Sequence, residues 1–220
     1  TISESAEFNS VISSYPEKGR TGYKLSETEN LPLTISANAE DNVIRVYYVK
    51  DTFGYTIEYY YDGSKDDSAT ISESAEFNSV ISSYPEKGRT GYKLEKTENL
   101  PLTISANAED NVIRVYYVKD TFGYTVEYYY DGKLDDNKTV SESATFNSVI
   151  SSYPDKCPTG YKLEKTENLP LTVSAKAEDN VIRVYYVKDT FGYTVEYYYD
   201  GSKDDSATIS ESAEFNSVIS

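Results

Sequence analysis

Histidine and glutamine are absent from this 220-residue sequence, and cysteine occurs once. Without histidine, the chain lacks the side chain most often used for acid–base catalysis near neutral pH, which is also a common metal ligand. A single cysteine can form neither an intrachain disulfide nor a cysteine zinc site. A thioester between cysteine and glutamine is excluded as well. Most catalytic chemistries therefore lose their usual residues here.

Long apolar runs and excess positive charge are also missing. The longest apolar runs are as long as one β-strand, which is too short for a membrane-spanning helix. Lys and Arg number 21 against 37 Asp and Glu, giving a net charge of -16. This charge repels nucleic-acid phosphates and anionic lipid head groups, so we expect no nucleic-acid partner and no membrane insertion in this segment. With no initiating Met, signal peptide or anchor, the sequence is interpreted as part of a longer protein.

The sequence repeats itself every 69 residues. The string TISESA begins at Thr1, Thr70 and Thr208, and TVSESA begins at Thr139. A 69-residue period is too long for one solenoid turn and suits a small domain, so it predicts an elongated beads-on-a-string array. The predicted divisions are a partial copy at 1–51 that lacks its first strand, complete copies at 52–120 and 121–189, and a partial copy at 190–220 with the first two strands.

Each complete copy contains five segments with the residue pattern of strands. In the copy at 121–189 they are 124–130, 139–146, 161–163, 169–175 and 181–187. The first two are predicted to form a hairpin around Asp131 and Gly132. Pro170 lacks an amide donor, which favours a sheet edge for its segment. The most apolar segment, 181–187, is expected at the sheet centre.

A short helix is predicted between the second and third strands. Phe146, Val149, Ile150 and Tyr153 have the i, i+3, i+4, i+7 spacing of one buried helical face, with Asn147 as the cap and Pro154 as the stop. A mixed sheet covered by one short helix corresponds to a β-rich α+β, β-grasp-like domain.

Three segments of each copy resemble a known family: GYTVEYYYDG, GYKLEKTENLPLTVSA and NVIRVYYVKD. They are similar to the mucin-binding-type (MucBP-like, β-grasp) tandem repeats of Gram-positive bacterial cell-surface adhesins, in which a strand ending in Asp-Gly opens the domain. The resemblance covers nearly the whole chain. It implies a β-grasp-like fold, an extracellular, cell-surface or secreted location, and a place in the stalk or adhesive region of a wall-anchored protein. The segment FNSVISSYP departs from the family pattern.

Tyrosine is abundant, with 24 residues, and three tyrosines occur in succession in three of the copies. Because side chains alternate along a strand, the middle tyrosine points away from its two neighbours. One interpretation is that tyrosine is a good strand former. The other is that an exposed row binds sugar rings or a partner protein. The candidate ligand-binding residues are Tyr60, Tyr129 and Tyr198.

Acidic residues gather around each Asp-Gly turn. The candidate metal ligands are Asp62, Asp66, Asp67, Asp131, Asp135 and Asp136. Calcium binds several oxygens at one point, but this spacing is not that of an EF-hand, and a solvated turn is the favoured interpretation. We expect no cofactor, with calcium as the ion to test. Glycoside hydrolysis needs two carboxylates about 5 to 9.5 Å apart across a cleft, for which a small domain has little room, so no enzyme is predicted.

The connections between copies are too short for free tumbling. Phe53, Phe122 and Phe191 stand in them and are predicted to wedge between adjacent domains. The partial copies would expose strand edges. The favoured explanation is a window of a longer array; the alternative is that the C-terminal piece of one chain completes the N-terminal piece of the next.

Two functions follow from these patterns. The first is a structural repeat array of an extracellular bacterial surface protein, a stalk or filament whose partners are copies of itself or adjoining repeats. Its acidic surface would keep neighbouring arrays apart. The second is a multivalent adhesin module that binds mucin glycans or a host protein through exposed tyrosines and acidic loops, gaining avidity from repetition.

Overall fold

A computed structural model describes residues 1–219. Strands make up 52% of the chain and helix 3%, which confirms the predicted β-rich class; the larger sheets are open and mixed. The chain divides into two compact units. Unit 1 is Thr1–Gly88 with Leu94–Val118, and unit 2 is Arg89–Lys93 with Lys119–Ser220.

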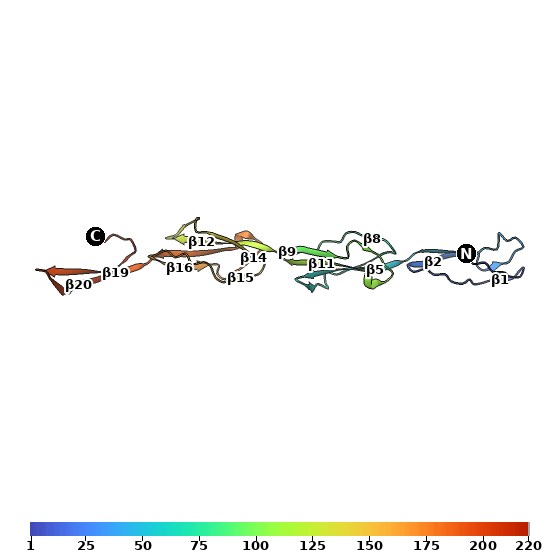
Figure 1. Ribbon diagram of the computed structural model, residues 1–220, viewed down its shortest axis with the longest axis horizontal. Coiled ribbons are helices and arrows are strands. Elements are labelled where there is room, and N and C mark those ends of the chain that lie inside the picture. Colours follow the sequence, from blue (N-terminus) through green and yellow to red (C-terminus); the bar gives the residue numbers. More distant parts are fainter. Residues whose placement is uncertain (220) are drawn as a thin grey trace. The chain divides into compact units, whose positions relative to one another are not determined.

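Residues 1–51 form two small sheets (Figure 1). Their strands are β1 (Val11–Ile12), β2 (Tyr23–Glu29), β3 (Leu33–Thr34) and β4 (Arg45–Lys50). β1 pairs with β3 and β2 pairs with β4, both antiparallel. Within residues 1–219, β4 has a strand partner on one edge only.

Residues 52–120 contain a five-stranded mixed sheet. Their elements are β5 (Thr52–Tyr61), β6 (Ser64–Lys65), β7 (Ile71–Glu76), β8 (Val80–Ile81), β9 (Tyr92–Glu98), β10 (Leu102–Thr103), the 3-10 helix η1 (Ala108–Asp110) and β11 (Val112–Lys119). The sheet order is β6-β5-β11-β9, and β7 pairs with the first half of β5. β5 and β11 are parallel, so β5 is paired on both edges. β8 and β10 form a separate antiparallel pair.

Residues 121–189 repeat this arrangement. Their elements are β12 (Thr121–Tyr130), β13 (Lys133–Leu134), β14 (Val140–Thr145), β15 (Val149–Ile150), β16 (Tyr161–Glu167), β17 (Leu171–Thr172), η2 (Ala177–Asp179) and β18 (Val181–Lys188). As predicted, β12 and β14 form a hairpin and β18 lies inside the sheet, between β12 and β16. The strand expected at 161–163 is longer, and the one expected at 169–175 shrinks to β17. The last elements, β19 (Thr190–Tyr199) and β20 (Ser202–Glu214), form an antiparallel hairpin.

The core of residues 121–189 lies on one face of their sheet. Val126 and Tyr128 of β12 and Val184 of β18 are at most 1% exposed, because alternate side chains of both strands point to the same side. Ile182, Tyr186 and Leu171 complete the buried cluster. Further side chains from the β15 and β17 segments pack on it, so these short strands cover the core.

No helix forms over 146–153, and the helix in the predicted fold class is wrong. Asn147 adopts a left-handed φ of 62°, which interrupts regular backbone, and β15 then pairs with β17. The helical spacing does not mark one buried face, because its members have different surroundings. Ile150 and Tyr153 pack on the core, whereas Val149 is 58% exposed. The helices in the part of the chain that the structure describes are the two 3-10 turns.

Candidate functional site

The most elaborate polar and aromatic arrangement lies where one sequence copy meets the next, and we call it the junction. At the first junction β4 runs into β5 with only Asp51 between them. The Asp51 amide donates to the Gly22 carbonyl at 2.9 Å, and the Asp51 carbonyl accepts from the Phe77 amide at 2.8 Å. Both backbone groups of this one residue therefore bind parts of two different copies.

The Asp51 side chain also has partners, at a partly exposed site. One carboxylate oxygen, Oδ1, lies 2.9 Å from Lys24 Nζ and accepts from the Thr52 amide at 2.8 Å. The hydrogen bond from Lys24, helped by that from Thr52, lowers the pKa of the Asp51 carboxyl below its usual 3.8. Lys24 and Asp51 both belong to the earlier copy, so this ion pair holds the last residue of that copy in place.

An aromatic cluster completes the junction. Gly22 has a φ of 82°, and a Cβ placed on it would stand 2.2 Å from the Phe77 ring. Only glycine tolerates both that backbone conformation and that contact. The Phe77 ring also meets the edges of Tyr23 and Phe53, with centroids 6.2 and 6.1 Å away. The ring of one copy thus sits against a glycine of the preceding copy.

The same junction occurs twice within unit 2. Its residues there are Gly91, Lys93, Asp120, Phe122 and Phe146, and then Gly160, Lys162, Asp189, Phe191 and Phe215. The lysine to aspartate distances are 2.9 and 3.0 Å. Phe8 occupies the equivalent position in the first partial copy and is 66% exposed, with no preceding copy to contact among residues 1–219.

The residues predicted to wedge between adjacent domains lie in these junctions. Beside each of them lies a second phenylalanine; one of these, Phe146, was predicted to be part of a helix. Phe53 and Phe122 are half-buried and Phe191 is 51% exposed; each meets the edge of a second phenylalanine from its own copy. That phenylalanine makes the contact with glycine. The signal in the sequence was the recurrence of one phenylalanine in all four copies and of one glycine in the first three, at fixed spacing.

The middle tyrosines lie on the outer face of each sheet, opposite the core. Tyr60 stacks on Tyr116 with centroids 4.8 Å apart, and its hydroxyl donates to Glu58 Oε2 at 2.9 Å. Tyr129 repeats this with Tyr185 at 4.7 Å and with Glu127. Their neighbours Tyr59 and Tyr128 are 0% exposed, as strand alternation predicts. Tyr198 lies on the hairpin and is 58% exposed.

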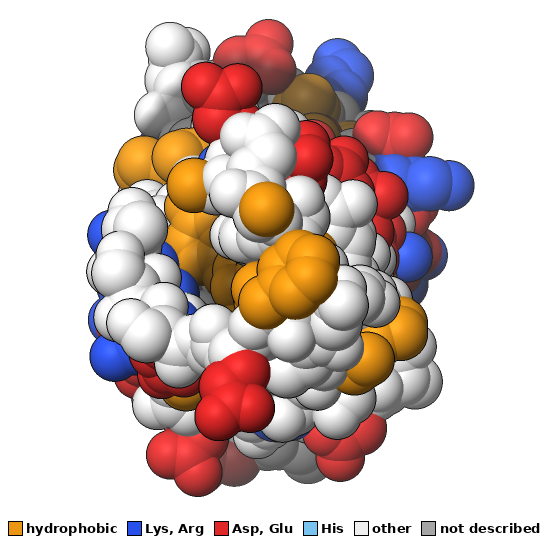
Figure 2. Space-filling model, turned by 90° about the vertical axis from the view of Figure 1, so that its right-hand side faces the viewer, with side chains coloured by type: hydrophobic (Ala, Val, Ile, Leu, Met, Phe, Trp, Pro, Cys, Tyr) orange, Lys and Arg blue, Asp and Glu red, His pale blue; other side chains and the backbone are white. Residues whose placement is uncertain are grey.

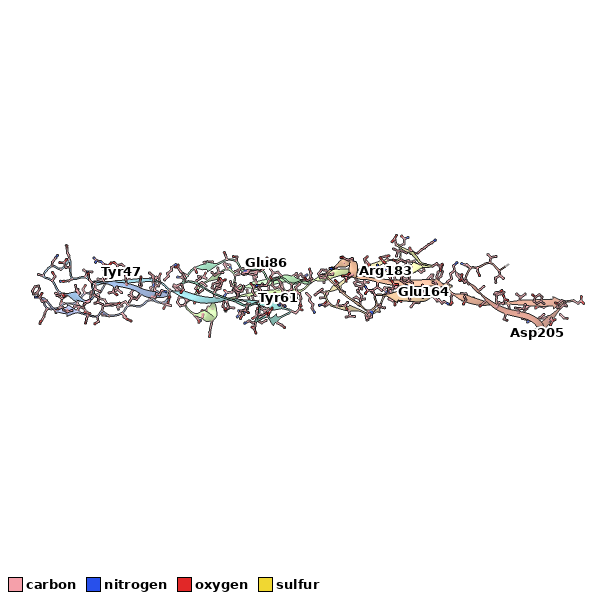
Figure 3. The ribbon with its side chains drawn as sticks, turned by 180° about the vertical axis from the view of Figure 1, so that it is seen from behind. Tyr47, Tyr61, Glu86, Glu164, Arg183 and Asp205 are labelled. Carbon is pink, nitrogen blue, oxygen red and sulfur yellow. The ribbon has the colours of Figure 1, made fainter. Side chains whose placement is uncertain are left out.

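An ion-pair network crosses the parallel strands on this outer face. Glu58 of β5 accepts from Arg114 of β11 at 3.2 Å and from Lys65 at 2.7 Å. Burial would raise the pKa of the Glu58 carboxyl, but the hydrogen bonds from Lys65 and Tyr60 outweigh it and lower that pKa. Arg183 and Glu127 form the equivalent pair at 3.1 Å; Figure 3 labels Arg183 on β18.

Sequence reasoning missed one buried polar residue in each complete copy. Asn180 is 0% exposed and follows η2. Its Oδ1 accepts from the Ser174 amide at 2.8 Å, while its Nδ2 donates to the Ser174 carbonyl at 2.8 Å and to the Gly123 carbonyl at 3.1 Å. Asn111 does the same with Ser105 and Gly54. This asparagine therefore ties the last strand of a copy to its first.

The acidic turns use several of their carboxylates in local hydrogen bonds. Asp66 Oδ1 accepts from the Ser68 amide at 3.0 Å, and Asp135 Oδ1 from the Asn137 amide at 3.1 Å. Asp67 lies 3.5 Å from Lys65 Nζ, and Asp131 accepts from the Tyr161 hydroxyl at 3.1 Å. The remaining candidates, Asp62 and Asp136, are exposed. Across residues 1–219 the structure brings no three His, Cys, Asp or Glu side chains into a group that could hold a metal ion.

Comparison with known proteins adds no relative. A scan against protein-family models finds no match, and a search of curated proteins finds none either. Within the described residues, no helix has the length and apolar character needed to cross a membrane. The functional argument therefore rests on the junctions.

Proposed function

We propose that this chain is a structural repeat array, a stalk or filament segment in which small β-grasp-like domains of 69 residues are docked on one another. The observation that carries the proposal is the junction. Asp51 leaves no linker between β4 and β5, and its two backbone hydrogen bonds engage Gly22 and Phe77. A flexible tether would need neither contact.

The junction combines interactions that restrain bending in different ways. The hydrogen bonds of Asp51 link the two copies, the ion pair with Lys24 holds the Asp51 side chain on the earlier copy, and Phe77 fills the space beside Gly22. Because the same residue types make the same contacts at three places, they would repeat one geometry along an array. A stiff array resists compaction, which is what a stalk requires.

The composition supports an exposed, hydrated setting for such an array. A net charge of -16 disfavours lateral collapse of neighbouring arrays through mutual repulsion. The resemblance to mucin-binding-type repeats supports an extracellular location on a Gram-positive cell surface. That location, and the β-grasp assignment, are parts of the proposal.

The adhesin alternative has less support from the tyrosines. In the complete copies, Tyr60 and Tyr129 each place one ring face on another tyrosine and direct the hydroxyl to a glutamate. In these positions both tyrosines make their contacts within the sheet itself. Loss of glycan binding in a folded variant with Tyr60, Tyr129 and Tyr198 changed to Ala would favour the adhesin.

The test of the structural proposal is the stiffness of the full chain in dilute solution, measured by small-angle X-ray scattering. A variant combining Phe77→Ala, Phe146→Ala and Phe215→Ala removes the ring from all three junctions. The matched control is Phe8→Ala, which removes an equivalent ring that is 66% exposed. We expect the scattering of a stiff rod for the wild type and the control, and a shorter mean end-to-end distance for the triple variant.

Circular dichroism checks that each variant keeps its strands. A wild-type profile that fits a freely jointed chain of domains would contradict the proposal. So would a folded triple variant whose profile equals that of the wild type.

A further inference from the structure

The backbone enters each complete copy through its first strand and leaves it through its last. In the copy at 121–189, β12 begins at Thr121, directly after Asp120, and β18 ends at Lys188, directly before Asp189. One residue therefore separates each of these strands from the nearest strand of the neighbouring copy. Tension along the backbone reaches this copy at the start of β12 and at the end of β18, so these two strands are loaded first.

The two loaded strands are parallel neighbours in the sheet. Six residues of β12 pair with six of β18, from Thr125 opposite Val181 to Tyr130 opposite Tyr186. Because both strands run in the same direction, the start of β12 and the end of β18 lie at opposite ends of the pair. The two points are about 36 Å apart along the strands, at about 3.3 Å per residue. Tension between them pulls one strand along the other.

Backbone hydrogen bonds join the two strands over the whole length of the pair. At one end the Thr125 amide donates to the Asn180 carbonyl at 2.9 Å. At the other end the Asp131 amide donates to the Tyr186 carbonyl at 3.0 Å. The Asn180 side chain adds a bond to the Gly123 carbonyl at 3.1 Å. Because these bonds run across the strands, sliding loads all of them at once, whereas pulling adjacent strand ends apart would break them one by one.

Aromatic side chains cover both faces of this strand pair. On the core face Tyr128 and Tyr186 are at most 2% exposed, and their ring planes are 4° apart. On the outer face Tyr129 stacks on Tyr185, with centroids 4.7 Å apart. Figure 2, which looks toward β1, shows a different kind of surface, made mostly of charged side chains and of polar or backbone atoms. Hydrogen bonds covered by rings are stronger than those that water can reach.

The other complete copy has the same arrangement in its first and last strands. β5 and β11 pair in parallel over six residues, from Thr56 opposite Val112 to Tyr61 opposite Tyr117. The side chain of Asn111 reaches from the start of β11 to a carbonyl of β5 at 3.1 Å, as Asn180 does in the next copy. The parallel pair is therefore a feature of the repeat and recurs wherever a complete copy occurs.

We propose that each complete copy is a tension-bearing domain, in which the parallel pair of its first and last strands resists a pulling force by shear. This function is to keep the length of the array under tension, which is a different property from stiffness against bending. It rests on the proposed structural array, because tension reaches the two strands through the neighbouring copies. The rate of forced unfolding, rather than the free energy of unfolding, measures such resistance.

Single-molecule force spectroscopy of the full chain tests the direction of loading. Handles are attached through two introduced cysteines, with Cys157→Ser so that no other thiol is present. In the shear geometry they are Thr121→Cys and Thr190→Cys, at equivalent positions of neighbouring copies. In the matched control, Glu178→Cys takes the place of Thr190→Cys, so that the force acts on the adjacent starts of β12 and β18. All three positions are exposed, so these substitutions should keep the fold.

The shear geometry should resist more than the control at the same loading rate. We expect it to unfold at a force at least about twofold higher. The length gained identifies the event, because the 69 residues from Thr121 to Thr190 span about 240 Å when fully extended. Equal forces in the two geometries, or a lower force in shear, would overturn the proposal.

Two asparagine variants in the shear geometry test the bonds between the strands. Asn180→Ala removes a side-chain bond that joins β18 to β12. Asn168→Gly removes bonds to the Asp179 and Val181 carbonyls, which do not join these strands, and glycine tolerates the φ of 58° at this position. We expect Asn180→Ala to lower the unfolding force and Asn168→Gly to leave it unchanged. Equal losses in two variants that keep their strands by circular dichroism would overturn the proposal.

The outcome is separable from that of the structural function. A chain that scatters as a stiff rod but unfolds at equal forces in the two geometries would overturn the tension-bearing pair and leave the stalk intact. A chain that scatters as a flexible string but resists shear would overturn the stiff array and leave the tension-bearing pair intact.

Discussion

β12 and β19 have the same ten residues, TFGYTVEYYY, and different surroundings. Tyr128 in β12 is 0% exposed, whereas the identical Tyr197 in β19 is 40% exposed. β12 has a strand on each edge, and β19 has one only, β20, within the described residues. The residue pattern decides which side chains face the core, but the neighbouring strand decides whether a core exists.

β4 and β11 are a second pair of strands with the same sequence and different neighbours. Residues 43–50 and 112–119 are identical, yet β11 begins at Val112 while β4 begins two positions later, at Arg45. The segment 39–41, equivalent to η1, is a turn and no 3-10 helix. Without a first strand beside it, the start of this strand loses the backbone partners that would hold it extended.

The largest expected difference in stability comes from truncating one tyrosine in each of the two identical strands. Tyr128→Ala empties a buried site and should lower the free energy of unfolding by about 3 to 5 kcal/mol. Tyr197→Ala removes an exposed ring and should change it by less than about 0.5 kcal/mol in dilute solution. Denaturant unfolding of both variants measures the difference; equal effects would show that β19 is buried in the single molecule.

The buried asparagine gives a second, smaller contrast. Asn180→Ala leaves the Ser174 amide and the Gly123 carbonyl without a partner in a buried site, which should cost about 2 kcal/mol. Asn42→Ala removes the equivalent side chain from the partial copy, where only the contacts to Ser36 exist, and should cost about 1 kcal/mol. Thermal unfolding followed by circular dichroism compares them. A larger loss for Asn42→Ala would contradict the comparison.

Substitution by alanine should destabilise the chain more at a junction glycine than at an ordinary turn glycine. Gly91 and Gly132 both have positive φ, at 82° and 76°, so alanine strains both by about 1 kcal/mol. At Gly91 the added Cβ would also stand 2.3 Å from the Phe146 ring, while nothing lies within 4 Å at Gly132. We expect Gly91→Ala to destabilise the chain by at least about 1 kcal/mol more than Gly132→Ala in urea unfolding. Equal losses would mean that Phe146 moves aside freely.

The smallest expected effect is a dependence of the junction on acid. The hydrogen bond from Lys93, with that from the Thr121 amide, lowers the pKa of the Asp120 carboxyl below its usual 3.8. Its contribution is present above pH 3.8 and is lost as the pH falls through the lower folded-state pKa. The melting temperatures of wild type and Asp120→Asn should therefore differ at neutral pH and converge in acid. A difference that persists in strong acid would assign the effect to something other than the carboxylate.

Much of the fold could be predicted from the sequence because its strands alternate clearly. The β12–β14 hairpin and the interior place of β18 follow from aromatic and apolar patterns. The segment from Phe146 to Tyr153 could not be predicted in this way, because its hydrophobic residues have three different surroundings. Phe146 lies in a junction, Ile150 and Tyr153 pack on the core, and Val149 is exposed. A spacing argument treats them as one face.

The junction was predicted only in outline. The short connection and Phe53 indicated a stiff contact, but the roles of Gly22 and Asp51 depend on backbone groups that come together only in three dimensions. The roles of the buried Asn111 and Asn180 could not be predicted either. Each binds a glycine carbonyl, of Gly54 or Gly123, that is 57 residues away in the sequence.

Hydrogen exchange of β12 and β19 in the same sample tests the central claim most directly, with mass spectrometry on peptides that reach Leu134 or Lys203, where the two copies differ. The claim is that a missing neighbouring strand accounts for the difference between identical sequences. At low concentration the amides of β12 should be protected and those of β19 much less so. Equal protection of the amides of β12 and β19 would contradict this claim.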